Sequence, residues 1–493
     1  EIFARGQMAG FRVHGVEIAG ERVEEALDVF AEVAGYTAMS RRYSISTSGA
    51  QDVVEIAITR QQGFDSPRLM GIEVFSDAAM DEGVIGCDEA PVEPMPTEEH
   101  GIAFDVYDLL LRPGPGFGQI EVSEDAGGSW SAPVGFGALL DGREPGAKFK
   151  FSAGHYRGLS GKAKDRMHFM GAQGGEVILS GARDLGAGAW QRMGQGLWFL
   201  DVSFERGPTD VSRLLEGTAR VRDIFPEDLW IDDVRALHVT SREATRASAE
   251  RFFIDYGAGD GGAHRVYIGV DPATVSGIDL VTQGYFLVGQ QVEDVTVENV
   301  ILERYASMPN NGPIGGGGAW NERFTKGWKV RYSTLRENHG IGVRLGRGGV
   351  LEHCDIYDNG QAGLRAFGSD WEVVNGNRRY LDPVAVVIRN NRIHRNNQLD
   401  YDWHYEGGAL KISATRAGST FENNWVHDNR GFGIWYDVDN AAANIRQNLT
   451  TDNWGHGIFY EISDGGTVIE RNVSLDNGTM SDTAGAGIYI SNS

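Results

Sequence analysis

A short motif that returns at a nearly constant spacing constrains this chain more than any other feature. Between residues 331 and 493, an Asn is followed four positions later by a Gly, and a short strand-like run comes directly after it. The motif occurs at 338–342, 359–363, 429–433 and 453–457. Five residues before the Asn stands a second recurrent position, occupied by Ser333, Cys354, Asn391, Asn424, Asn448 and Asn472. The most regular repeats are 24 residues apart, and such a period is typical of a solenoid.

The pieces between these positions have strand length and lack a helical period. They predict a right-handed parallel β-helix, in which each strand lies about 4.8 Å from the strand of the next coil. The recurrent Asn side chains are expected to stack at the corners, where they bond each other and the turn backbone. Asn448, Asn472 and Asn477 match the Asn-x-Ser/Thr pattern, but we interpret them as structural because they occupy repeat positions. A leucine-rich repeat would need a Leu lattice, and propeller blades would need about twice the length.

The composition narrows the class of partner. The net charge of −24 argues against a nucleic-acid ligand, whereas an acidic surface is compatible with Ca²⁺. The two cysteines, Cys87 and Cys354, make no disulfide framework, and Cys354 is expected to be a buried small residue. No apolar run is long enough to predict a membrane span. The chain starts inside a domain pattern and stops within a strand pattern at 489–493, so we expect a fragment of a longer protein.

Three regions are predicted along the chain. In residues 1–76, polar and apolar residues alternate within short runs separated by polar turns, which predicts a β-sandwich. Residues 77–145 are expected to form a linker with a small β region, and residues 146–493 a truncated β-helix. Residues 182–262 fit the period poorly. We expect a short helix within 213–225, and further strands of the β-helix with an excursion at 229–233, 252–257 and 266–271.

Two coils of the repeat are stretched. The extra residues lie at 369–382 and 398–407, and the Gly-rich segment 312–318 is a third excursion. Insertions in a solenoid usually map to one face, which is often the binding face. The segment 398–407 brings Asp400, Asp402, His404 and Glu406 just before Lys411, and these groups are expected to reach over that face. We assign His404 and Glu406 to substrate binding.

Alignment on the Gly of the motif sorts the strand residues into faces. The residue after the Gly is apolar and is expected to point inward: Val343, Leu364, Leu410, Ile434, Ile458 and Ile488. Alternation sends the next residue outward, which gives the column Arg344, Arg365, Lys411, Trp435, Phe459 and Tyr489. Two residues further, the column reads Gly346, Phe367, Ser413, Asp437, Glu461 and Ser491. A slip of one residue would bury these groups, so the prediction depends on the register.

The outward residues suit an extended, anionic polysaccharide. Trp435 and Phe459 are the expected platforms for sugar rings, and Arg344 and Arg365 are the expected partners of carboxylate or sulfate groups. Arg presents a bidentate fork to such groups. We therefore assign these residues to substrate binding as well.

Asp437 and Glu461 are the candidate catalytic carboxylates. On neighbouring coils they are expected about 5 Å apart, a separation that fits a retaining glycoside hydrolase better than an inverting one. Two like charges this close raise one pKa, so that one group acts as acid and the other as nucleophile, in an order that the sequence leaves open.

The same residues are open to different interpretations. Outward charged and aromatic residues can be surface decoration, and Trp435 can simply pack under a loop. Asp437 with Asp439 or Glu461 offers the hard oxygen ligands that Ca²⁺ prefers. Lys411 is also a candidate base that takes the proton beside a uronate carboxylate, while an Arg or Ca²⁺ neutralises that carboxylate; this chemistry would be that of a lyase or epimerase.

The first 76 residues resemble the second half of a malectin-like carbohydrate-binding domain. The matching pieces begin at Glu1-Ile-Phe-Ala, Phe11-Arg-Val, Leu27-Asp-Val-Phe-Ala-Glu-Val-Ala-Gly and Gly71-Ile-Glu-Val. The resemblance implies a β-sandwich, whose first half, with part of the sugar site, would lie upstream of residue 1. A purely structural sandwich that spaces or caps the β-helix is the alternative.

Residues 300–493 resemble the right-handed β-helix proteins of the pectate-lyase-like superfamily. The motifs are Tyr405-Glu-Gly-Gly-Ala-Leu-Lys, Gly433-Ile-Trp-Tyr-Asp and Gly457-Ile-Phe-Tyr-Glu-Ile-Ser. The resemblance implies a secreted bacterial protein, extracellular or at the cell surface, that acts on polysaccharide. The signatures of pectate lyases, polygalacturonases and alginate epimerases are absent, so the reaction type stays open. We expect a glycoside hydrolase, with a lyase or epimerase that uses Lys/Arg and Ca²⁺, or a non-catalytic adhesion protein, as alternatives.

Overall fold

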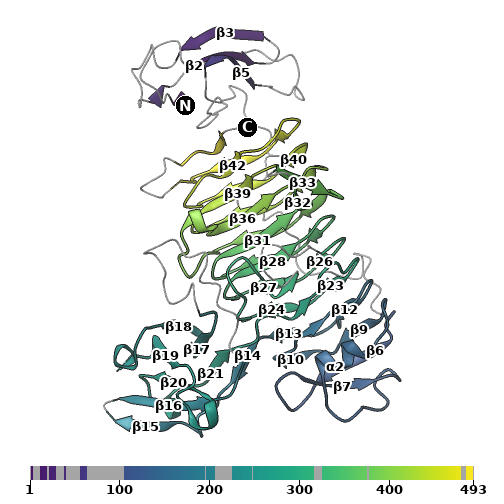
Figure 1. Cartoon of the computed structure of the whole chain (residues 1–493), viewed down its shortest axis with the longest axis vertical. Helices are drawn as coiled ribbons and strands as arrows, with labels where there is room; N and C mark the ends of the chain where they lie inside the picture. The colour runs from purple at the N-terminus through teal and green to yellow at the C-terminus, as the bar shows by residue number, and fades with distance from the viewer. Residues whose placement is uncertain are drawn as a thin grey trace.

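The chain winds into a column of coils, as the computed structural model shows (Figure 1). The structure describes residues 105–194, 196–205, 225–246, 248–315, 325–374, 377–478 and 485–491, together with the backbone of five strands between residues 2 and 63. Strands of successive coils pair in parallel, and the coils contribute to three long sheets. The predicted parallel β-helix is therefore confirmed for this part of the chain.

Each of the three sheets follows one side of the column. The first sheet contains β9 (Lys148–Phe151), β12 (His168–Gly171), β23 (Thr296–Glu298), β26 (Lys329–Arg331), β29 (Val350–Glu352), β34 (Val386–Arg389), β37 (Ser419–Glu422), β40 (Ala443–Arg446) and β43 (Val468–Glu470). The second contains β10 (Gly154–Arg157), β13 (Val177–Ser180), β24 (Ile301–Glu303), β27 (Thr334–Arg336), β30 (Asp355–Tyr357), β35 (Arg392–His394), β38 (Trp425–His427), β41 (Leu449–Thr451) and β44 (Val473–Leu475). The third contains β28 (Ile341–Leu345), β31 (Ala362–Phe367), β36 (Gly408–Ser413), β39 (Phe432–Asp437), β42 (Ile458–Glu461) and β45 (Ile488–Ser491). The short strands β11 (Gly161–Lys162), β22 (Leu287–Val288) and β25 (Ile314–Gly315) precede the third sheet, and β25 contacts β28.

Two ladders of polar side chains close the corners of the coils. In one, the amide Nδ2 of each Asn donates to Oδ1 of the Asn in the next coil, from Asn338 to Asn477, over 2.8 to 3.0 Å. The other runs from Asn391 to Asn472, and buried Cys354 joins it through its backbone N–H. The residue before each ladder position has a φ of 48° to 58°, a left-handed conformation that turns the chain sharply. The structural interpretation of Asn448, Asn472 and Asn477 is confirmed.

A separate sheet interrupts the coils between β13 and β22. It consists of β14 (Ala182–Asp184), β15 (Gln191–Gly194), β16 (Leu197–Val202), β17 (Asp228–Ile231), β18 (Val234–His238), β19 (Arg251–Asp255), β20 (His264–Ile268) and β21 (Ile278–Val281). We call it the inserted sheet; it has its own apolar cluster and adjoins the lower coils in Figure 1. The prediction that 229–233, 252–257 and 266–271 are strands of the β-helix was wrong. The first pairs antiparallel with β18 and β21, and the other two pair antiparallel with each other as β19 and β20. Strand-length runs alone do not specify such partners.

The first sheet also includes strands that precede residue 146, where the sequence predicts the β-helix to begin. Strand β6 (Leu109–Pro113) pairs in parallel with β9, and it forms an antiparallel extension with β7 (Gln119–Ser123) and β8 (Val134–Gly135). Helix α2 (Phe136–Asp141) turns Phe136 and Leu140 into the core at this end of the column. The rings of Phe136 and Phe286 stack 5.5 Å apart, so α2 covers the open end of the apolar core.

Some predictions lie outside the described residues. In the first region the described backbone forms β1 (Ile2–Phe3), β2 (Arg12–Ile18), β3 (Glu21–Asp28), β4 (Ala38–Met39) and β5 (Ile56–Gly63), with the antiparallel order β3-β2-β5. The malectin-like sandwich stays a prediction, as do the helix within 213–225 and the state of Cys87. Among the described helices, none has the length and apolar character needed to cross a membrane.

Candidate active site

The third sheet has the register that the sequence predicts. Across neighbouring strands, Arg344 pairs with Arg365, Arg365 with Lys411, Lys411 with Trp435, and Trp435 with Phe459. The alternate, inward residues, including Leu364 and Ile434, are fully buried in the core of the column. Alternation therefore places both predicted columns on the outer side of the third sheet, as expected.

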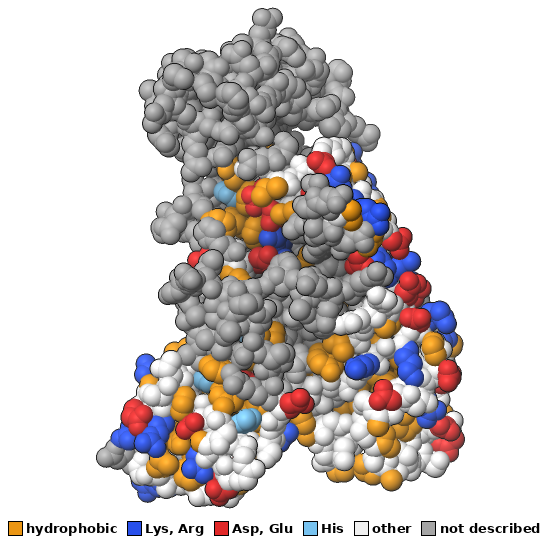
Figure 2. Space-filling view, in the orientation of Figure 1, with side chains coloured by type: hydrophobic (Ala, Val, Ile, Leu, Met, Phe, Trp, Pro, Cys, Tyr) orange, Lys and Arg blue, Asp and Glu red, His pale blue; other side chains and the backbone are white. Residues whose placement is uncertain are grey.

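This outer side is covered. Lys411 is 8% exposed, Asp437 6% and Trp435 5%, although all three lie outside the apolar core. Figure 2 shows basic, acidic and hydrophobic side chains gathered at the height of β36 to β42. The candidate residues thus form a shielded polar cluster, and they are not part of an open, solvated surface.

Lys411 is the centre of the cluster. Its Nζ lies 2.6 Å from Oδ2 of Asp437 and 3.2 Å from Oε1 of Glu406. Glu406 also forms an ion pair with Arg365, which is 3% exposed. Burial and the charge of Arg365 lower the pKa of Lys411, and Asp437 opposes that shift. The stretched segment 398–407 therefore does reach this face, and it does so through Glu406.

Glu461 has different surroundings from the neighbouring Asp437. Its Oε1 accepts a hydrogen bond of 3.0 Å from the indole N–H of Trp435. Burial and the negative charge of Asp437 raise the pKa of Glu461 to about 7. Asp437 pairs directly with Glu461 across β39 and β42. The site therefore holds a proton on Glu461 near neutral pH, while the ammonium of Lys411 offsets the charge of Asp437.

The second oxygen of Asp437 is distinctive. Oδ2 is held by Lys411, but Oδ1 is buried and has no hydrogen-bond partner among the described residues. A buried carboxylate oxygen without a partner is costly in a folded protein. Such an oxygen keeps an unused capacity to accept a hydrogen bond.

Neighbouring side chains occupy both faces of the Trp435 ring. Its ring stacks on Phe459 with centroids 5.8 Å apart and planes inclined by 8°, and the ammonium of Lys411 lies 4.2 Å from the ring centroid. Phe432 packs edge-on against both rings. With its faces occupied, Trp435 is a packing and hydrogen-bonding residue. Phe459 belongs to the same buried aromatic cluster, and the platform role of both rings stays a prediction.

The remaining predicted residues have other surroundings, although Arg344 stands beside Arg365 in the third sheet. Arg344 donates a hydrogen bond of 2.6 Å to Asn311, and Asp439 accepts one from the hydroxyl of Tyr380. Asp400 and Asp402 occupy exposed positions of the segment 398–407. The side chain of His404 lies outside the described part of the chain.

The metal alternative receives no support from the described residues. No group of three or more His, Cys, Asp or Glu side chains among them is arranged to hold a metal ion. Asp437 is paired with Lys411 and Asp439 with Tyr380, whereas a Ca²⁺ site usually takes six to eight oxygen ligands. A calcium site at Asp437, Asp439 and Glu461 therefore stays a prediction.

A buried network that sequence reasoning missed supports the segment carrying Glu406. The hydroxyl of Tyr401 lies 3.3 Å from Nε2 of His339, and Nδ1 of His339 lies 3.1 Å from Asp228 in the inserted sheet. Gln361 donates a 2.8 Å hydrogen bond to the carbonyl of Tyr405. Asp228 and His339 are 111 residues apart in the chain, so no local pattern indicates that they meet.

Comparisons with known proteins agree with the fold. The family described as the right handed beta helix region matches residues 319–493. The fold is a right-handed parallel β-helix. No curated protein matches the sequence.

Among solved structures, the complex of XylC with xylose is similar to this chain. Its TM-score is 0.56 at 15% identity, over 71% of this chain and 64% of XylC, so the chain spans slightly less than two thirds of that protein. The pectate lyase Pel9A matches 77% of this chain and 81% of its own length, with 14% identity and a TM-score of 0.35. At 15% identity, the likeness to XylC concerns the fold alone.

Proposed function

We propose that this β-helix is a retaining glycoside hydrolase that acts on an extended, anionic polysaccharide outside the cell. The observation that carries the proposal is the unequal pairing of two adjacent carboxylates: Asp437 with Lys411 at 2.6 Å, and Glu461 with the indole of Trp435 at 3.0 Å. Two neighbouring carboxyl groups whose surroundings differ in this way commonly serve as general acid and nucleophile. The xylose complex of XylC, which is similar in fold, supports a sugar as ligand.

The roles follow from the surroundings of each carboxylate. Glu461, whose pKa is raised to about 7, donates its proton to the glycosidic oxygen as the bond to the anomeric carbon breaks. Oδ1 of Asp437 attacks that carbon and forms a glycosyl ester. Water then displaces Asp437 after giving a proton to Glu461, which restores both groups. Neighbouring strands lie about 4.8 Å apart, close to the ~5–5.5 Å separation of carboxyl groups in retaining enzymes.

Lys411 and Arg365 bind an anionic group of the substrate. Lys411 offsets the charge of Asp437 in the free protein. Arg365 and Lys411 share Glu406, so a carboxylate or sulfate of the sugar that replaces Glu406 would meet two cations. This exchange favours an anionic polymer over a neutral one.

A second candidate function rests on the lowered pKa of Lys411. Burial and Arg365 both favour its neutral form, which is the form required of a base that removes a proton beside a uronate carboxylate. In this candidate the protein is a lyase or epimerase, and Arg365 neutralises the carboxylate.

The test uses a panel of acidic and neutral polysaccharides, with reducing ends and the ultraviolet absorbance of a new double bond measured together. We expect reducing ends without new absorbance. Asp437→Asn and Glu461→Gln should each lower turnover by about 10² to 10⁴-fold, and Asp452→Asn, an exposed acid at a corner, is the matched control. New absorbance that vanishes in Lys411→Met but survives in Asp437→Asn would favour the lyase. Binding without either signal would identify a non-catalytic adhesion protein.

A further inference from the structure

A cavity of about 820 Å³ lies between the inserted sheet and the first coils, away from the candidate active site. Its described lining includes Phe117 from the loop before β7, Lys162 from β11, Arg183 from β14, and Tyr285 and Glu205. Sites for small ligands have volumes of this order and often lie where two bodies meet. The lining combines aromatic rings, two cations and one carboxylate.

Arg183 is a partly buried cation in the lining of this cavity. Its guanidinium lies 4.5 Å from the ring centroid of Phe117, and Nη1 donates a hydrogen bond of 3.1 Å to the carbonyl of Ser203. Nε is buried without a hydrogen-bond partner among the described residues. Burial lowers the pKa of Arg183, which means that the cation is incompletely solvated. An acceptor in the cavity would relieve this cost.

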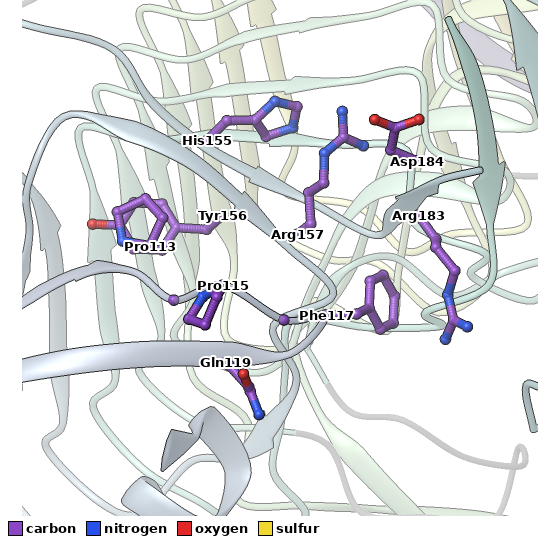
Figure 3. Close-up of a pocket in the computed structure, with 11 residues that line it drawn as sticks. Pro113, Pro115, Phe117, Gln119, His155, Tyr156, Arg157, Arg183 and Asp184 are labelled. Atoms are coloured by element: carbon purple, nitrogen blue, oxygen red, sulfur yellow. The ribbon is translucent and has the colours of Figure 1, made fainter. Parts of the chain in front are cut away.

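Phe117 packs against both Gly158 and Arg183. Gly158 has a φ of 74°, and the ring of Phe117 fills the space that a side chain at Gly158 would occupy. Figure 3 shows Phe117 and Arg183 side by side at one end of a smaller hollow of about 230 Å³, with His155 and Arg157 farther along its lining. The same pair lines both hollows.

Lys162 adds a second cation at the mouth. It is exposed on β11, and no carboxylate among the described residues pairs with it. The amides of Gln283, Gln290 and Asn311 supply further donors and acceptors to the lining. The set of an aromatic ring, a guanidinium, an ammonium and amides matches the faces, carboxylate and hydroxyls of an acidic sugar.

We propose that this cavity is a second carbohydrate site, which binds a uronic acid residue with its carboxylate toward Arg183 and Lys162 and its ring against Phe117 or Tyr285. The choice of a sugar as ligand rests on the proposed function, whereas the cavity and its cations do not. Val288 of β22 lines the cavity, and four strand spacings separate β22 from β36, which is about 19 Å. The cavity is therefore a site distinct from the cluster at Lys411.

Calorimetric titration with two probes tests the proposal: trigalacturonate, and xylotriose that carries one glucuronic acid. The trigalacturonate methyl ester has the same rings without charge. We expect at least one acid probe to bind, and Arg183→Gln to weaken its binding by about tenfold or more. The ester should bind weakly and should not respond to that change. Arg112→Gln is the matched control, because Arg112 also lies over an aromatic ring, Trp130, at 4.3 Å, outside the cavity.

Lys162→Gln is a second variant for the case that Arg183→Gln does not fold. Because Lys162 is exposed, its replacement should leave the fold intact. It should also weaken the binding of the acid probes. The proposal is overturned if neither probe binds the unchanged protein, or if both variants bind as tightly as it does. The same titrations on Asp437→Asn separate the two proposals: a failure of hydrolysis with Arg183-dependent binding intact would contradict only the proposed function.

Discussion

Asp437 and Glu461 are neighbouring acids whose surroundings differ in charge. Lys411 lies 2.6 Å from Asp437, whereas Glu461 accepts a hydrogen bond from an uncharged indole. A cation stabilises an ionised carboxylate much more than a neutral donor does. Lys411, which stands on the strand preceding Asp437, thus gives Asp437 a direct cationic partner, whereas burial and the charge of Asp437 act on Glu461.

The raised pKa of Glu461 predicts the pH dependence of activity. Glu461 must carry its proton to act as an acid, and it does so below its pKa of about 7. We expect kcat/KM to fall about tenfold per pH unit above that value. The hydrogen bond from Trp435 lowers the pKa of Glu461, so Trp435→Phe should move this alkaline limb to higher pH. Initial rates across a pH series measure both effects. A rate that rises with pH above 7 would contradict the assignment and fit Lys411 as a base.

The residues of the third sheet could be assigned to columns from the sequence because strands alternate strictly. What covers these columns could not be assigned. Alternation specifies a direction for Trp435, but it carries no information on the ring of Phe459 or the ammonium of Lys411 that occupy its faces. Glu406 was expected over this face from its place in a stretched coil, and its bridge between Arg365 and Lys411 came only from the structure.

Among the structural elements, the Asn ladder joins the corners of neighbouring coils by hydrogen bonds. Asn429 is fully buried, its amide donates to Asn453 at 2.9 Å, and its Oδ1 accepts from the backbone and side chain of Asn396. Asn429→Ala leaves these buried donors without a partner, at about 1–3 kcal/mol for each group. We expect the free energy of unfolding to fall by about 3 kcal/mol or more, measured by chemical denaturation.

Asn444 offers the matched control for the ladder. It lies at an exposed position of β40, so Asn444→Ala should change the unfolding free energy by less than about 0.5 kcal/mol. Similar losses in the two variants would mean that the ladder does not stabilise the coils.

The recurrence of Asn was sufficient to predict these corners, but the sequence did not reveal their left-handed backbone conformation. Tyr332, His353, Gln447 and Arg471 each precede a ladder residue with φ between 50° and 54°. Asp or Asn, which favours this conformation, stands at other corners such as Asp358 and Asn390, but the coil on both sides also imposes the turn on residues such as Tyr332 and Arg471. The inserted sheet was misinterpreted for a related reason: its strands have the same length as those of a coil, and only their pairing distinguishes them.

At the scale of the whole molecule, charged residues join the inserted sheet to the coils. Arg304, in the coil after β24, bonds Glu337 of the next coil at 2.7 Å and Asp233 and Asp279 of the inserted sheet at 2.8 and 3.1 Å. Its guanidinium also lies 4.4 Å from the ring centroid of Trp230. The cavity proposed for an acidic sugar is lined from both bodies, so its shape depends on this junction.

Arg304→Met should loosen the junction, because three carboxylates then lose a common cation. Breaking a buried ion pair on one side costs about 3–5 kcal/mol, and the side chain of Arg304 is only 9% exposed. We expect hydrogen exchange to become faster in β17 and β18, while β38 and β41 keep their protection. The control is Arg265→Met, since Arg265 pairs with Asp201 inside the inserted sheet at 2.6 and 2.8 Å. Unchanged exchange at β17 and β18 in Arg304→Met would show that packing alone holds the two bodies together. In that case the acid-sugar cavity would keep its shape without Arg304, and binding of trigalacturonate to this variant would be unaltered.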